Sequence, residues 1–112
     1  MSYDASGLLE FFLQEAEEHI HNLEEGISNL EQIVDASTVE SLFRSAHTLK
    51  GAAALVKLNA ISRIAHRMED ILEELKAGQR NTDNHIKQLL LYGLDAIKDE
   101  IRKVSNGENE TP

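Results

Sequence analysis

The sequence predicts an all-α fold, an antiparallel up-down-up-down four-helix bundle, and three observations support this prediction. Apolar residues recur at spacings of three and four in four separate segments, the pattern of a helix face packed against a core. Hydrophobic residues make up 41% of the chain but aromatic residues only 4%, so the core must consist mainly of aliphatic side chains. The single proline is Pro112, so no proline interrupts any of the segments. Short connections between them favour antiparallel neighbours.

The first helix is predicted to span roughly residues 5 to 34, with Asp4 as its cap. The second is predicted to open at Ser37, because Glu40 three residues later completes a capping box. The apolar stripe of the first helix comprises Phe12, Ala16, Ile20, Leu23, Ile27, Leu30 and Val34. The stripe of the second comprises Val39, Leu42, Phe43, Ala46, Leu49, Ala53 and Val56.

A tight turn at residues 57–59 leads into the third helix, with Asn59 as the expected cap. Gly78 is predicted to stop this helix, and Thr82 or Asp83 to cap the fourth, which ends at Gly107. The third stripe comprises Ile61, Ile64, Ala65, Met68, Ile71, Leu72 and Leu75. The fourth comprises Ile86, Leu90, Leu94, Ile97, Ile101 and Val104.

A histidine in the second helix is the leading candidate for function. His47 stands one residue off the apolar stripe, followed by Lys50 and Gly51. Glycine in a helix interior costs about 1 kcal/mol relative to alanine, so Gly51 requires a reason. It either clears space beside His47 or allows close packing against another helix. Gly93, in the fourth helix, we attribute to close packing.

The hairpin of the second and third helices predicts companions for this histidine. At about 100° per residue, His47 and Glu69 lie at equal rotations from their stripes, and these flanks either border one groove or both turn away from it. With the pivot at Leu58, His47 lies level with Glu69, and Lys50 lies level with His66.

Charge and hydrogen bonding suggest what these groups do. A carboxylate that accepts the proton of one imidazole nitrogen makes the other nitrogen a better nucleophile. Lys50 would neutralise part of a phosphoryl charge, because phosphoryl transfer depends mainly on positioning and electrostatics. The sequence has no glycine-rich phosphate loop and no cluster of metal carboxylates. We therefore expect a substrate of phosphorylation that has no ATP site, cofactor or metal of its own.

The run from His47 to Ala53, HTLKGAA, resembles histidine phosphotransfer (HPt) domains, and the flanking residues 43–46 and 66–72 resemble the CheA-type subfamily. The resemblance implies that His47 receives phosphate from a histidine kinase domain, of the same or a partner chain, that holds ATP and Mg²⁺. It implies that His47 passes this phosphate to an aspartate of a response-regulator receiver. The positions that surround the acceptor in that subfamily are Glu69, Lys50 and His66, and the expected docking surface comprises Gly51, Ala54, Arg44 and Thr48.

Composition narrows the remaining possibilities. The net charge of −9 makes nucleic acid an unsuitable partner, and the absence of cysteine excludes disulfides and thiolate metal sites. No apolar run approaches the length of a membrane span.

We expect a monomeric, cytoplasmic phosphotransfer domain at residues 1–105 and a flexible acidic tail, or the start of a linker, at 106–112. A fifth helix, common in CheA-type domains, would begin where this tail lies.

Three alternatives stay open. The domain is either part of a histidine kinase or a free-standing carrier. A helical module that docks a basic partner through its acidic face would not be phosphorylated. A carboxylate-bridged di-metal bundle needs two Glu-x-x-His pairs that point inward. Here Glu18 is turned outward, and the third helix carries the reversed order from His66 to Glu69.

Overall fold

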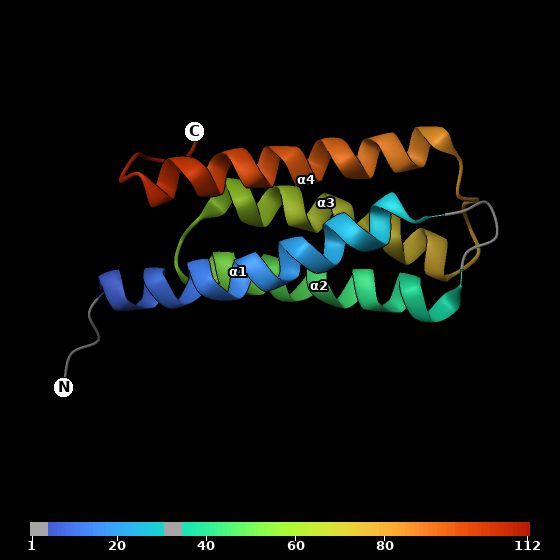
Figure 1. Cartoon of the computed structure of the whole chain (residues 1–112), viewed down its shortest axis with the longest axis horizontal. Helices are drawn as coiled ribbons and strands as arrows, with labels where there is room; N and C mark the ends of the chain where they lie inside the picture. The colour runs from blue at the N-terminus through green and yellow to red at the C-terminus, as the bar shows by residue number, and fades with distance from the viewer. Residues whose placement is uncertain (1–4, 31–34) are drawn as a thin grey trace.

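The computed structural model describes residues 5–30 and 35–112, and within them it contains four α-helices and no strand. The helices are α1 (Ala5–Ser28), α2 (Ala36–Leu55), α3 (Asn59–Lys76) and α4 (Asn84–Ser105). Consecutive helices run in opposite directions, and α1 packs against both α2 and α4, which closes the bundle (Figure 1). The predicted antiparallel up-down-up-down bundle is confirmed.

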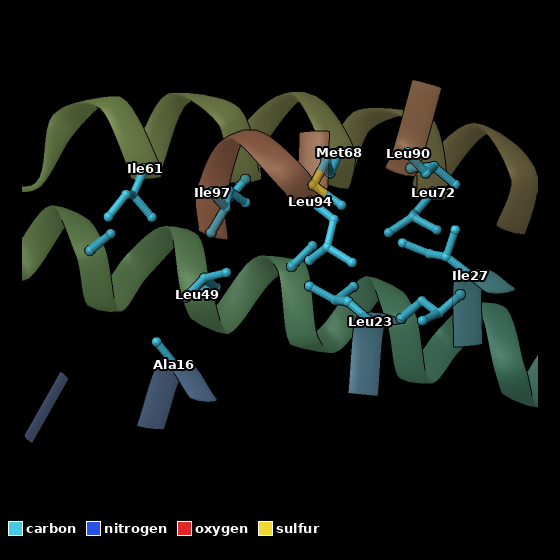
Figure 2. Packing of buried hydrophobic residues seen from close by; sticks show 14 of the residues in the cluster. Ala16, Leu23, Ile27, Leu49, Ile61, Met68, Leu72, Leu90, Leu94 and Ile97 are labelled. Carbon is cyan, nitrogen blue, oxygen red and sulfur yellow. The ribbon is translucent and has the colours of Figure 1, made fainter. Parts of the chain in front are cut away.

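The four apolar stripes meet along the axis of the bundle. Every stripe residue that the structure describes is buried or half-buried, and Val34 lies outside the described residues. Figure 2 shows side chains from all four helices interdigitating at this centre. The largest fully buried side chains are Leu23, Ile27, Leu42, Leu49, Ile61, Leu72, Ile86, Leu90, Leu94 and Ile97. Burial of each of these side chains stabilises the fold by about 1.5–3 kcal/mol. The fold therefore depends on the inner faces of the helices, and residues on the helix flanks can serve other roles.

Helix α1 ends earlier than predicted, at Ser28. The side-chain nitrogen of Asn29 donates to the carbonyl oxygen of Glu25 at 2.9 Å, and the backbone nitrogen of Asn29 donates to the same oxygen at 3.2 Å. Asparagine competes in this way for helix carbonyls, which favours termination. The expected extension to residue 34 is therefore wrong at residues 29 and 30, and residues 31–34 and the expected cap Asp4 lie outside the described residues.

Helix α2 begins at Ala36, and its cap is Asp35, not the predicted Ser37. The Asp35 carboxylate accepts the backbone N–H of Ser37 at 3.4 Å and the Ser37 hydroxyl at 2.5 Å. These bonds lower the pKa of the Asp35 carboxyl. Glu40 does not complete a capping box, because its carboxylate pairs with Lys76 of α3 at 2.9 Å and with Arg44 at 3.1 Å.

The connection between α2 and α3 is three residues long, which holds the two helices in a fixed register. Lys57 takes the left-handed conformation, with φ of 63°, and the N–H of Leu58 donates back to the carbonyl of Ala53 at 2.8 Å. Asn59 is not the cap of α3: Leu58 holds that position and supplies no side-chain bond. The helix start is therefore satisfied from elsewhere in the chain.

The C-terminal segment supplies that missing cap. The Glu110 carboxylate accepts the backbone N–H groups of Ala60 at 3.1 Å and Ile61 at 2.8 Å. The N–H of Thr111 donates to the buried carboxylate of Glu100 at 2.9 Å, which lowers the pKa of that carboxyl. The segment 106–112, which the sequence analysis expects as a flexible acidic tail or the start of a linker, lies against the end of the bundle that carries the α2–α3 connection (Figure 1). The reason is that a carboxylate fits the unsatisfied donors of a helix N-terminus.

The other predicted helix ends are confirmed. Gly78 and Gly107 follow α3 and α4 with φ of 73° and 79°, conformations that glycine adopts without strain. Asp83 caps α4 by accepting the N–H of Ile86 at 2.8 Å. A Cβ at Gly93 would lie 2.9 Å from Met68, so the predicted close packing there is confirmed. No helix within residues 5–30 and 35–112 combines the length and apolar character that a bilayer crossing requires.

Candidate functional site

His47 lies at the middle of α2, on the flank that faces α3. Its neighbour Ala46 is fully buried, and the step of about 100° per residue turns the imidazole out of the core. The His47 side chain is 61% exposed. The predicted accessibility of this ring is confirmed.

Glu69 of α3 binds both of the predicted companions on α2. Its Oε2 contacts Nδ1 of His47, and its Oε1 accepts a hydrogen bond from Nζ of Lys50 at 2.8 Å. The Glu69 side chain is only 8% exposed, so this carboxylate lies beneath the imidazole and the ammonium group. The flanks of α2 and α3 therefore face each other, which decides between the two orientations that the sequence left open.

Burial and pairing act in opposite directions on Glu69. Burial raises the pKa of the carboxyl, but hydrogen bonds from Lys50 and His47, and the charges of the same two groups, lower it by more. The net pKa lies below the ordinary value, so Glu69 is ionised at neutral pH. A buried carboxylate of this kind needs its partners, because an unpaired buried charge is costly.

The contact with Glu69 distinguishes the two ring nitrogens of His47. An ionised carboxylate only accepts hydrogen bonds, so Nδ1 carries the proton. In the neutral ring Nε2 then has a lone pair, and the described part of the chain gives Nε2 no hydrogen-bond partner. The arrangement presents a nucleophilic nitrogen to an incoming group and leaves the carboxylate to stabilise the imidazolium that forms.

A second contact to the imidazole was not foreseen from the sequence. The ring of Phe43, one turn earlier on α2, stacks on the ring of His47 with centroids 6.0 Å apart and planes 14° apart. Nζ of Lys76 lies 4.8 Å from the centroid of Phe43. Phe43 belongs to the predicted apolar stripe. Its spacing of four residues from His47 is the signal from which the stack could have been predicted, because residues four apart are neighbours on a helix.

Among the described residues, His66 makes no hydrogen bond to the imidazole of His47. Its Nε2 is 3.7 Å from Oδ1 of Asp70, and both side chains are more than half exposed. The expected alignment of His66 with Lys50 gives no bond between them among the described residues, and Lys50 binds Glu69 instead. His66, Glu69 and Asp70 offer ligand atoms within 4.8 Å of one another. A cation there would compete with Lys50 and His47 for Glu69.

The surface beside His47 is open. A Cβ built at Gly51 would meet no atom within 4 Å, so the alternative that Gly51 packs closely against another helix is wrong. Arg44, Thr48 and Ala54 are exposed as well. Leu55 continues this surface and is 81% exposed. Its exposure is not evident from the sequence, because an apolar residue next to an apolar stripe is ordinarily part of the core.

This chain belongs to the Hpt domain family. The model of that family, described as "Hpt domain", matches residues 7–107, which is nearly the whole chain. The match includes both helices that carry the site.

Within this family, the similar relatives are chemotaxis proteins. The chain is 37% identical over 101 residues to the chemotaxis protein CheA of Treponema pallidum, covering 89% of this chain and 12% of that protein. It is 39% identical over 93 residues to CheA of Borreliella burgdorferi, covering 82% of this chain and 11% of that protein. The chain thus spans a small part of the length of these relatives.

A solved structure has the same fold. The CheA phosphotransferase domain from Thermotoga maritima superposes with a TM-score of 0.83 at 24% identity, covering 93% of this chain and 99% of that chain. This likeness supports the four-helix arrangement independently of sequence.

Proposed function

We propose that this chain is the phosphoacceptor and phosphocarrier domain of a two-component phosphorelay. An ATP-dependent histidine kinase domain phosphorylates His47, which then passes the phosphoryl group to an aspartate of a response-regulator receiver. The observation that carries the proposal is the imidazole of His47, held at Nδ1 by buried Glu69 while the ring stays exposed. Membership of the Hpt family and similarity to CheA proteins support it.

The chemistry follows from the two ring nitrogens. Nε2 attacks the terminal phosphorus of ATP, the N–P bond forms, and the bond from that phosphorus to the leaving ADP oxygen breaks. Nδ1 keeps its proton, and Glu69 accepts the hydrogen bond from it and stabilises the positive ring. In the second transfer, the aspartate carboxylate attacks the phosphorus, the N–P bond breaks, and the imidazole returns to its neutral form. Lys50 offsets phosphoryl charge in both steps, because phosphoryl transfer relies on fixed electrostatics.

The same open surface would admit both partners. Gly51 and Ala54 leave the approach to His47 free of bulk, and Leu55 adds an exposed apolar contact at the end of α2. Arg44 and Thr48 flank the histidine with polar groups. Glycine at position 51 makes the helix less stable than alanine would. Because its side is open, this glycine serves access to His47 and not the packing of the fold.

The wider assignments belong to the same proposal. ATP and Mg²⁺ are held by the separate kinase domain, and this domain acts as a monomer in the cytoplasm, where ATP is present. His66 supports the acceptor from the neighbouring turn of α3. The relatives from Treponema pallidum and Borreliella burgdorferi favour a CheA-type kinase as the parent protein over a free-standing carrier, because both are chemotaxis proteins named CheA.

The test is phosphorylation of the chain by a CheA kinase domain with radiolabelled ATP. We expect His47→Gln to abolish labelling while the circular dichroism spectrum shows that the fold stays intact. The matched control is His21→Gln, because His21 is an exposed histidine on α1, remote from Glu69. Undiminished labelling of His47→Gln, or equal loss in both variants, would contradict the proposal.

A further inference from the structure

We propose that Phe43 is a positioning residue for the phosphoryl acceptor: its ring fixes the plane of the His47 imidazole and thereby aims Nε2. This inference rests on the proposed function and names a residue that the charge pattern of the site does not reveal. The observation is the stack of the two rings, 6.0 Å between centroids and 14° between planes.

The hydrogen bond to Glu69 alone does not orient the acceptor. It restrains one atom of the ring, Nδ1, and because a hydrogen bond tolerates bending, the ring can still tilt about the Cβ–Cγ bond. The torsion between Cβ and the ring of a histidine has a broad energy minimum, so the side chain itself adds little restraint. With 61% of the His47 side chain exposed, packing adds little more.

The stacked ring supplies the missing restraint. A near-parallel neighbour fixes the plane of the imidazole, and this plane, together with the Cβ–Cγ bond that lies in it, determines the direction of the Nε2 lone pair. Offset stacking is a favoured arrangement for aromatic pairs. Because phosphoryl transfer requires the attacking atom in line with the leaving group, this direction affects the rate directly.

Phe43 is itself held from two sides. One side of the residue packs against the hydrophobic core, where it is half-buried. Nζ of Lys76 lies 4.8 Å from the centroid of its ring, and Glu40 holds that ammonium at 2.9 Å. A cation over an aromatic face is attracted by the ring, so Lys76 of α3 fixes Phe43 on α2.

A small phosphodonor separates this effect from docking. With phosphoramidate, Nε2 of His47 attacks phosphorus, the new N–P bond forms, and the P–N bond to the leaving ammonia breaks. Nδ1 keeps its proton at Glu69 throughout. Because phosphoramidate makes no protein–protein contact, a change in rate reports on the acceptor ring and not on a kinase surface.

The experiment compares the whole chain with its Phe43→Leu and Phe43→Tyr variants in phosphoramidate. Leucine retains apolar packing but has no flat face, whereas tyrosine retains the ring. We expect Phe43→Leu to slow phosphorylation about 2- to 10-fold, the scale of an aromatic pair, and Phe43→Tyr to restore the wild-type rate. Nitrogen NMR of His47 is expected to show Nδ1 protonated in all three proteins, so that the change is one of orientation. Melting curves verify that all three are folded at the assay temperature.

A double substitution tests the role of Lys76. Lys76→Gln is expected to slow the reaction by about twofold, the lower end of cation–π effects at exposed sites. It is expected to have no effect when Phe43→Leu is already present, because Lys76 acts through that ring. An equal effect in both backgrounds would show that Lys76 acts independently of Phe43.

The two proposals fail in different ways. If wild-type protein gains no phosphate at His47 from the kinase or from phosphoramidate, the proposed function fails. If wild-type protein is phosphorylated and folded Phe43→Leu reacts at the same rate, the function stands and the positioning role is overturned. A slow Phe43→Tyr variant would likewise contradict it, because the stacking face is still present.

Discussion

Two glutamates each accept two hydrogen bonds at helix α3, and the two carboxylates have different roles. At its middle, Glu69 binds the ring of His47 and the ammonium group of Lys50. At its N-terminus, Glu110 of the C-terminal segment binds the backbone N–H groups of Ala60 and Ile61. Glu69 binds an imidazole that remains open to solvent, whereas Glu110 binds backbone N–H groups that have no partner within their own helix.

The difference shows how one chemical group supports either reactivity or stability. A carboxylate that satisfies backbone donors completes a helix and leaves nothing exposed to react. A carboxylate beneath an imidazole satisfies one nitrogen and leaves the other available. The two regions should therefore respond oppositely to substitution: loss of Glu69 should affect the rate of phosphorylation, and loss of Glu110 should affect folding.

The largest effect is expected from Glu69→Ala. Without the carboxylate, His47 loses its fixed tautomer and the charge that stabilises the imidazolium. Removal of the carboxylate partner of a metal-bound histidine costs about 10- to 100-fold, and we expect phosphorylation of His47 to slow by the same scale. The measurement is the rate of labelling by a CheA kinase domain, with Glu73→Ala, an exposed glutamate on α3, as the control. An unchanged rate would show that Glu69 is a bystander.

The reciprocal substitution is Glu110→Ala. It leaves two donors of α3 without their cap, and loss of a helix cap costs about 0.5–2 kcal/mol. We expect the free energy of unfolding in urea to fall by that amount and the rate of phosphorylation to stay constant. Glu108→Ala is the matched control, because Glu108 is an exposed neighbour in the same segment. If Glu110→Ala slowed phosphorylation as much as Glu69→Ala, the division between the two regions would be lost.

A smaller effect is expected at two glycines, one on the open surface beside His47 and one packed between α3 and α4. Gly51→Ala should raise the free energy of unfolding by about 0.5–1 kcal/mol, because a Cβ there meets nothing and alanine favours helix. The same change should slow phosphorylation by a kinase domain more than by phosphoramidate. Gly93→Ala should instead destabilise the chain, because its Cβ would lie 2.9 Å from Met68. A loss of stability in Gly51→Ala would contradict the open surface.

The smallest effect is expected in the pH dependence of the free energy of unfolding, to which the titration of Glu69 contributes. Its pKa is lower in the folded chain than in the unfolded one, where it has an ordinary value of about 4.3. Ionised Glu69 therefore stabilises the fold fully above that pH, and the contribution is lost as the pH falls through the folded pKa. We expect the difference in free energy of unfolding between wild type and Glu69→Gln to shrink below about pH 4.3. A difference that stays constant to pH 3 would rule out this contribution.

Local patterns predicted the parts of the fold that local forces determine. The four stripes, the cap of α4 and the two terminating glycines depend on residues within one or two turns. The stripes were predicted from spacing, and the glycines and the cap, Thr82 or Asp83, from residue type. The cap of α2 was misplaced by two residues because Ser37 and Asp35 are both good caps, and the hydroxyl of Ser37 donates to Asp35. The end of α1 was missed because the side chain of Asn29 competes for a helix carbonyl, which periodicity does not register.

The site was predictable where a short hairpin fixes the register. Glu69 was located by equal distances from Leu58, and the structure brings it to His47. Phe43 and Glu110 were missed for different reasons. An aromatic residue on an apolar stripe is ordinarily core, and the bonds of Glu110 span about fifty residues, which no local motif signals.

The stack of Phe43 on His47 also has a magnetic consequence. Circulating π electrons in a phenyl ring shield nuclei that lie over its face and move their proton resonances upfield. With three phenylalanines and two tyrosines in the chain, few other rings produce such a displacement. The imidazole of His47 therefore carries a proton resonance moved by the ring of Phe43, and its chemical shift would report the position of the imidazole before and after modification.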